Sequence, residues 1–148
     1  MKKMLTVFAM VVMLAFASFS YGQVTNWRTA NQVTFAWDPV TTVTDQNGNP
    51  QPIPSGEIIS YSTYDFAPPV DRSQATLIHS GIVATQDTIT FTIQGKYIIG
   101  VKGVLSDNTG AELSESAIVW SDDPKACLNG QTFGISFYFP PVSPGGLH

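Results

Sequence analysis

Short runs of alternating apolar and polar side chains follow one another along most of the chain. Val33, Phe35 and Trp37 alternate with Thr34 and Ala36, and this two-residue period is typical of a β-strand with one buried face. After residue 22 no stretch shows the 3.6-residue period of a helix, so the pattern predicts an all-β protein. Strands are predicted over residues 33–37, 57–64, 75–83, 88–93, 96–105 and 115–120.

Turn-forming residues separate the predicted strands. Pro39 follows the first strand and cannot donate a hydrogen bond to a neighbouring strand. Asn47 and Gly48 both tolerate positive φ, so we expect a hairpin turn inside the loop over residues 41–55. Strands at this spacing, joined by turns, predict an antiparallel β-sandwich. The expected core residues are Val33, Phe35, Trp37, Ile89, Phe91, Ile93, Tyr97, Ile99 and Val101.

The first residues of the chain have the pattern of a secretory signal peptide. Lys2 and Lys3 precede an apolar run over residues 5–19, and the run is shorter than the roughly 20 apolar residues of a membrane-spanning helix. We expect cleavage after Gly22, with cleavage after Ala17 as the alternative. An uncleaved membrane anchor is the other interpretation of the same pattern. The sequence thus predicts a secreted or periplasmic protein without a stable membrane anchor after cleavage.

Three segments resemble strands of a fibronectin type III domain, which is an immunoglobulin-like sandwich. Residues 33–39 (VTFAWDP) are similar to its second strand, residues 58–61 (IISY) to its third, and residues 97–101 (YIIGV), with Gly110, Ser114 and Ser116 beyond them, to its sixth strand and the start of its seventh. The resemblance implies that Tyr97 is the corner tyrosine, whose hydroxyl bonds back to the chain. It also implies a non-catalytic spacer or binding module. The predicted division is a signal peptide over 1–22, the fibronectin type III-like sandwich over 23–123 and a C-terminal extension over 124–148.

The C-terminal extension contains one further apolar run. Residues 132–139 alternate, and prolines and glycines follow them. An apolar strand left in water favours aggregation, so this one should be buried. It completes this chain's own sheet, or it pairs with the sheet edge of another chain, or the terminus is disordered. The candidate partner-binding residues of the second alternative are Phe133, Ile135, Phe137, Tyr138 and Phe139.

The residues needed for catalysis or metal binding are sparse. Cys127 and His79 could form a nucleophile–base dyad, but a lone thiol and an ordinary strand histidine are the interpretation we favour. Cys127 could also form an intermolecular disulfide. Oxygen side chains over residues 45–49 are faintly similar to a Ca²⁺ loop, yet Pro50 stands where that loop needs Gly. We therefore predict a non-enzymatic protein with no cofactor and no metal.

Composition narrows the class of partner. Only 12% of the 148 residues are charged and the formal net charge is −4, which argues against nucleic-acid binding because phosphates require clustered Lys and Arg. We expect an interaction or structural module at the cell envelope or outside the cell. Its partner is predicted to be protein, self or other, bound through a sheet edge or the C-terminal strand. The alternative is a carbohydrate-binding module that uses the exposed aromatics Tyr61, Tyr64 and Phe66.

Overall fold

The computed structural model describes residues 23–141 of the chain. The predicted signal peptide, its cleavage position and residues 142–148 lie outside this described part. Within it the chain is mostly β-strand with short 3-10 turns, so the all-β prediction is confirmed. No helix within residues 23–141 has both the length and the apolar character required to span a membrane.

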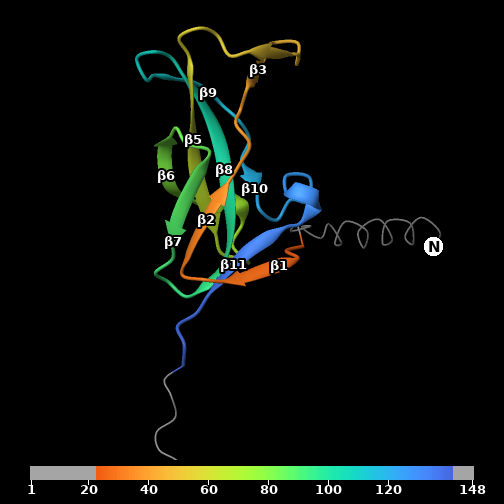
Figure 1. Cartoon of the computed structure of the whole chain (residues 1–148), viewed down its shortest axis with the longest axis vertical. Coiled ribbons are helices and arrows are strands. Elements are labelled where there is room, and N and C mark those ends of the chain that lie inside the picture. Colours follow the sequence, from red (N-terminus) through yellow and green to blue (C-terminus); the bar gives the residue numbers. More distant parts are fainter. Residues whose placement is uncertain (1–22, 142–148) are drawn as a thin grey trace, which may run out of the picture.

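A seven-stranded sheet forms the larger part of the molecule (Figure 1). Its long central strand is β8, which pairs with β5 on one side along almost its whole length. On the other side β8 pairs in turn with β11, β10 and β9. All of these pairs are antiparallel, whereas β1 pairs with β11 in parallel. The strands are β1 (Asn26–Thr29), β5 (Ile58–Phe66), β6 (Thr76–Ile82), β8 (Gly95–Ser106), β9 (Glu112–Glu115), β10 (Val119–Trp120) and β11 (Phe133–Phe137).

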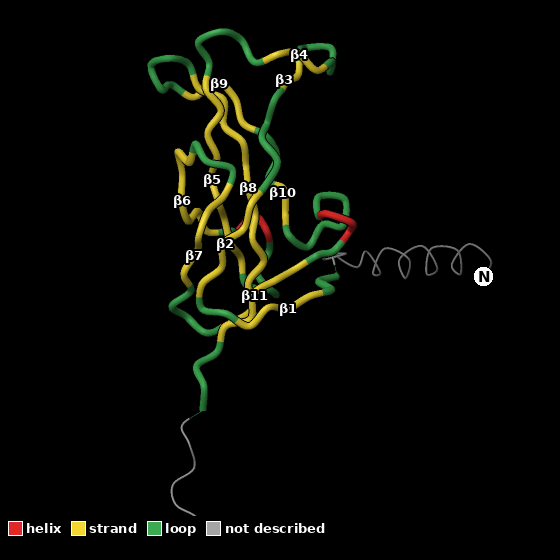
Figure 2. The backbone as a smooth tube through the Cα atoms, viewed as in Figure 1, coloured by secondary structure: helices red, strands yellow, loops and turns green. Residues whose placement is uncertain are grey.

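Two small two-stranded sheets complete the described part. β2 (Gln32–Ala36) pairs with β7 (Gln86–Thr90), and β3 (Thr42–Thr44) pairs with β4 (Pro50–Pro52). The tube in Figure 2 shows the β3–β4 hairpin at the end of the molecule farthest from β11. Gly48 lies in its turn with φ at +82°, so the hairpin predicted from Asn47-Gly48 is confirmed. The 3-10 turns are η1 (Arg72–Gln74) and η2 (Leu128–Gly130).

One core cluster joins the β2–β7 sheet to the large sheet. Side chains from β2 and β7 and the residue after β7 contact side chains from β8 and β11, and the alternation of the sequence selects which of them are buried. The buried members are Val33, Ile89, Phe91, Ile99, Ile135 and Phe137, with Phe35, Ile78, Tyr97 and Phe133 partly buried around them. At about 1.5–3 kcal/mol for each large side chain taken out of water, burial of this cluster stabilises the folded chain.

The opposite face of the large sheet carries a second cluster, which the sequence analysis did not predict. Phe66, Ile98 and Trp120 are buried there against Val24 and Tyr64, among others. The rings of Phe66 and Trp120 meet edge to face, with centroids 5.1 Å apart. Since Ile98 lies on this face and the adjacent Ile99 on the other, β8 is covered on both sides at this level.

Several expectations need correction. Ile93, predicted to lie in the core, is 74% exposed because β7 ends at Thr90 and the chain then turns away. The predicted strand over residues 115–120 is divided into β9 and β10. At this break the Ser116 hydroxyl accepts a hydrogen bond from the Gly103 N–H (3.0 Å), and the pairing with β8 is offset by one residue between β9 and β10. Trp37 lies just after β2 and is only partly buried.

The hydrogen bond expected from Tyr97 is confirmed. Its hydroxyl donates to the carbonyl oxygen of Ile93 at 2.6 Å and closes the turn that leads into β8. Its ring stacks on that of Phe91, with centroids 4.5 Å apart. This residue therefore connects the end of the small sheet to the central strand of the large one.

Candidate binding surfaces

The C-terminal aromatic run is divided between the core and the surface. Phe133, Ile135 and Phe137 point into the core cluster, because alternate residues of a strand share one face. β11 itself lies between β1 and β8 of the same chain. Tyr138 and Phe139 follow the strand and are exposed. The structure thus places this strand in its own sheet, the first of the three alternatives. A partner could reach the three core side chains only by displacing β11.

The three aromatic residues proposed for carbohydrate do not share a surface. Tyr61 is buried on the core face of β5, and its hydroxyl accepts a hydrogen bond from the Val40 N–H (2.9 Å). Tyr64 and Phe66 point to the opposite face, where Phe66 is buried beneath Trp120. Tyr64 is half-buried, with the Lys102 ammonium 5.4 Å from its ring centroid. Only Tyr64 of the three offers area to a ligand.

His79 and Cys127 have separate partners. The His79 ring lies 2.7 Å from the Asp87 carboxylate, and Cys127 donates to the Ser121 carbonyl (3.2 Å). Burial, and then the charges of two neighbouring aspartates, raise the pKa of the Cys127 thiol. A thiol with a raised pKa is a poor nucleophile at neutral pH, so the structure gives no support to the dyad.

In the loop over residues 45–49, which was considered for Ca²⁺, the Asp45 carboxylate is occupied by hydrogen bonds within the loop's own turn. Asp45 accepts hydrogen bonds from the backbone N–H groups of Asn47 (2.8 Å) and Asn49 (2.9 Å). The Gln51 side chain donates to its other oxygen (3.3 Å). These bonds lower the pKa of Asp45, that from Asn49 most strongly. Over residues 23–141 no three His, Cys, Asp or Glu side chains are grouped as metal ligands would be.

Asp87 connects the two sheets at one side of the molecule. It lies on β7, and it accepts hydrogen bonds from His79 on β6 and from the Thr63 hydroxyl on β5, each at 2.7 Å. Burial raises its pKa, but the hydrogen bonds from His79, Thr63 and the Thr88 N–H outweigh this, so the pKa of Asp87 lies below its ordinary value.

We predict that this carboxylate makes stability depend on acid pH. Because its pKa is lower in the folded state, its contribution is complete above the unfolded value of about 4 and is lost as the pH falls through the folded pKa. Urea unfolding at about pH 5 and about pH 3 should show a smaller loss for Asp87→Asn than for the unaltered chain. The exposed Asp38→Asn serves as control, and an equal loss in both variants would contradict the prediction.

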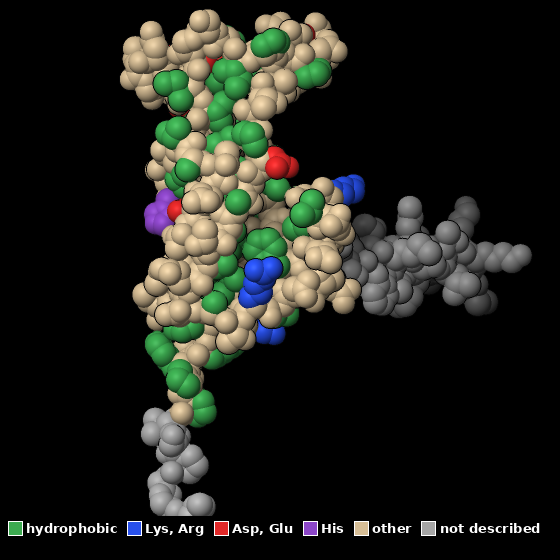
Figure 3. Space-filling view, in the orientation of Figure 1, with side chains coloured by type: hydrophobic (Ala, Val, Ile, Leu, Met, Phe, Trp, Pro, Cys, Tyr) green, Lys and Arg blue, Asp and Glu red, His purple; other side chains and the backbone are tan. Residues whose placement is uncertain are grey.

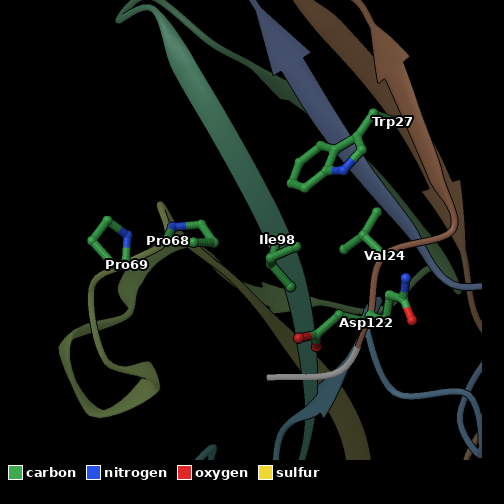
Figure 4. A pocket seen from close by; sticks show the side chains of 7 residues that line it. Val24, Trp27, Pro68, Pro69, Ile98 and Asp122 are labelled. Atoms are coloured by element: carbon green, nitrogen blue, oxygen red, sulfur yellow. The ribbon is translucent and has the colours of Figure 1, made fainter. Parts of the chain in front are cut away.

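A pocket of about 360 Å³ lies on the outer face of the large sheet, and sequence analysis missed it (Figure 4). Its walls are mostly apolar and come from β8, from the connection after β5, which includes two prolines, and from the chain before and within β1. Ile98, Val24 and Trp27 supply three of these side chains. The polar group in the wall is Asp122, which follows β10 and is buried. Asp122 belongs to the run Asp122-Asp123-Pro124, and such a run usually forms a solvated loop, so the sequence did not indicate that this side chain is buried.

Arg72 forms an ion pair with one oxygen of the Asp122 carboxylate. Its guanidinium donates to Asp122 Oδ2 at 2.7 Å and lies 5.9 Å and 5.8 Å from the ring centroids of Phe66 and Trp120. The cation is thus held between two aromatic rings and a buried carboxylate, an arrangement that suits the planar guanidinium group.

Comparisons with known proteins do not assign this chain to a family, so its function is inferred from the geometry of its surfaces. No family model matches the chain, and no curated protein or solved structure matches it.

Proposed function

We propose that the chain is an exported interaction or structural module built on an immunoglobulin-like sandwich of the fibronectin type III kind. The strand pairing supports this fold. In immunoglobulin-like sandwiches the second and fifth strands share one sheet, and the third, sixth and seventh share the other. Here β2, which resembles the second strand, pairs with β7, while β5 and β8, which resemble the third and sixth, pair with each other. The Tyr97 hydrogen bond fits the corner tyrosine of that family.

The observation that carries the function is an open, nearly uncharged side where the edges of both sheets meet. Among residues 23–141, β6 pairs with β5 only and β7 pairs with β2 only, and the His79–Asp87 contact holds β6 and β7 next to each other (Figure 1). Residues 76–90 contain no Lys, Arg or Pro. On the face drawn in Figure 3 charged side chains are few. We call this side, residues 76–90, the β6–β7 side.

An edge of this kind favours pairing with another strand. Proteins commonly protect exposed edges with charges, prolines or bulges. β6 has one of these devices, because its register against β5 is irregular near Thr63. It has no lysine, arginine or proline. Leu77 and Val83, at the two ends of the edge, are largely exposed. Main-chain pairing along β6, with these apolar side chains adding area, is the protein–protein contact that we propose.

Two leucines with equal exposure provide the test. Leu77 on β6 is 52% exposed and Leu113 on β9 is 51% exposed. If a second copy of the chain pairs along β6, sedimentation velocity should show association that rises with concentration. Leu77→Lys should weaken it by roughly tenfold or more, since an edge lysine opposes strand pairing, and Leu113→Lys should leave it unchanged. A chain that stays monomeric at every concentration, or that responds equally to both substitutions, would contradict the proposed contact.

A further inference from the structure

One oxygen of the buried Asp122 carboxylate has no partner in the described part of the chain. The side chain is 2% exposed, and its Oδ2 atom accepts the hydrogen bond from Arg72. Its Oδ1 atom is buried, yet no donor from residues 23–141 reaches it. A buried acceptor left without a donor destabilises the folded state, so this atom points to a missing positively charged or hydrogen-bonding group.

The start of the described chain is held beside this carboxylate. The hydroxyl of the buried Thr132 donates to the Gln23 carbonyl oxygen at 2.7 Å and accepts from the Thr25 N–H at 2.9 Å. Directly after Thr132, the Phe133 N–H donates to the carbonyl oxygen of Ser121 (2.9 Å). Since Ser121 precedes Asp122, these bonds keep Gln23 close to Asp122.

Gln23 and Asp122 are also walls of the same pocket. Figure 4 shows Val24, Ile98 and the Trp27 ring lining the same pocket as the Asp122 carboxylate. A charge pair within apolar walls is screened less than one in water. Two cations close to the pocket walls are already engaged. Arg72 is paired with Oδ2, and Lys96 lies 4.8 Å from the Trp27 ring centroid.

We propose that the pocket binds the α-ammonium group that cleavage after Gly22 creates on Gln23, and that this group pairs with the free oxygen of Asp122. The inference rests on the proposed export and cleavage. Hydrolysis of the peptide bond between Gly22 and Gln23 consumes one water, leaves a carboxylate on Gly22 and releases an amine on Gln23 that takes up a proton. The resulting ammonium has three donors where the peptide nitrogen had one. Removal of the leader thereby completes the buried cluster of Asp122 and Arg72.

The test measures how readily the Gln23 α-amine reacts. Only the unprotonated amine is acylated, so pairing with Asp122 should slow its labelling by an amine-selective reagent near neutral pH. The exported chain, with its first residue identified by intact mass, is compared with Asp122→Asn and with the neighbouring Asp123→Asn. We expect Asp122→Asn to label roughly tenfold faster, the effect of about one pKa unit on the free-amine fraction, and Asp123→Asn to label like the unaltered chain.

A second variant retains Asp122 and moves the amine instead. Two residues inserted between the leader and Gln23 place the new ammonium beyond the pocket, and we expect fast labelling although Arg72 and Asp122 remain paired. This variant distinguishes the proposal from a general loosening of the fold in Asp122→Asn. An N-terminal glutamine also cyclises with loss of ammonia. The unaltered chain should cyclise more slowly than Asp122→Asn, because its α-amine is held by the Asp122 carboxylate.

The outcomes separate the inference from the proposed function. Suppose that the secreted chain begins at Gln23 and that the α-amine labels equally fast in the unaltered chain, in Asp122→Asn and in the insertion variant. The proposed ion pair with Asp122 is then wrong, while the proposed module stands. If the chain begins at another residue or retains its leader, the predicted processing is wrong and the ion pair is overturned with it. Slow labelling restricted to the unaltered chain and Asp123→Asn is the supporting result.

Discussion

Replacing Ile135 with Ala is expected to lower the free energy of unfolding by about 2–5 kcal/mol, the usual cost of truncating a buried isoleucine. Its side chain is 0% exposed and lies in the core cluster that joins the β2–β7 sheet to the large sheet. The loss combines the apolar area no longer buried with the cavity that remains. Chemical unfolding followed by tryptophan fluorescence measures it.

The control is Tyr138→Ala, three residues further along the same run. Tyr138 is exposed beyond the end of β11, and a surface truncation of this kind changes stability by about 0.5 kcal/mol or less. Equal, small effects of the two substitutions would mean that β11 is not packed on its own chain in solution.

Replacing Gly100 with Ala should destabilise the second cluster by about 1–3 kcal/mol, as overpacking does in a closely packed site. Gly100 lies opposite Trp120 in the pairing of β8 with β10. A Cβ atom there would come within 2.5 Å of the Trp120 ring and 2.6 Å of Ile118. The indole ring can lie against the sheet only because position 100 has no side chain. Thermal or chemical unfolding of the variant checks this.

Gly95 provides a matched control at the start of the same strand. A Cβ atom at Gly95 would meet nothing nearer than the Tyr97 ring at 3.5 Å, which is ordinary contact. Gly95→Ala should therefore leave stability nearly unchanged. If Gly100→Ala is equally well tolerated, Trp120 does not cover β8 in the way described.

The sequence pattern predicted those strands and turns that are determined by neighbouring residues in the chain. Alternation located β2 and β8 closely, because each contributes alternate side chains to the core cluster. The Ile, Ser, Thr and Tyr content of residues 57–64 located β5. Turn chemistry located the β3–β4 hairpin and the turn over residues 107–110, where Asp107 accepts hydrogen bonds from the N–H groups of Thr109 and Ala111. The hydrogen bond from the Tyr97 hydroxyl was predicted from the family resemblance. It is also a local contact, because its acceptor, the Ile93 carbonyl oxygen, lies only four residues away.

Features that depend on contacts between distant segments escaped prediction. β1 has no alternation, as all four of its residues are exposed, and it exists through pairing with β11 near the other end of the chain. The run Tyr97-Ile98-Ile99 was interpreted as one-sided, although a strand buried on both faces has a continuous apolar run. Asp122 resembles a loop aspartate until Arg72 and the chain near Gln23 are brought beside it.

Residue-resolved hydrogen exchange of the purified chain, at a concentration where it sediments as a monomer, tests the central claim most directly. That claim is that β11 completes its own chain's sheet and leaves the β6–β7 side open. The account predicts that amides of β11 are protected to a degree similar to those of β5 and β8, its companions in the sheet. Rapid exchange throughout residues 133–137, while β5 and β8 stay protected, would contradict it.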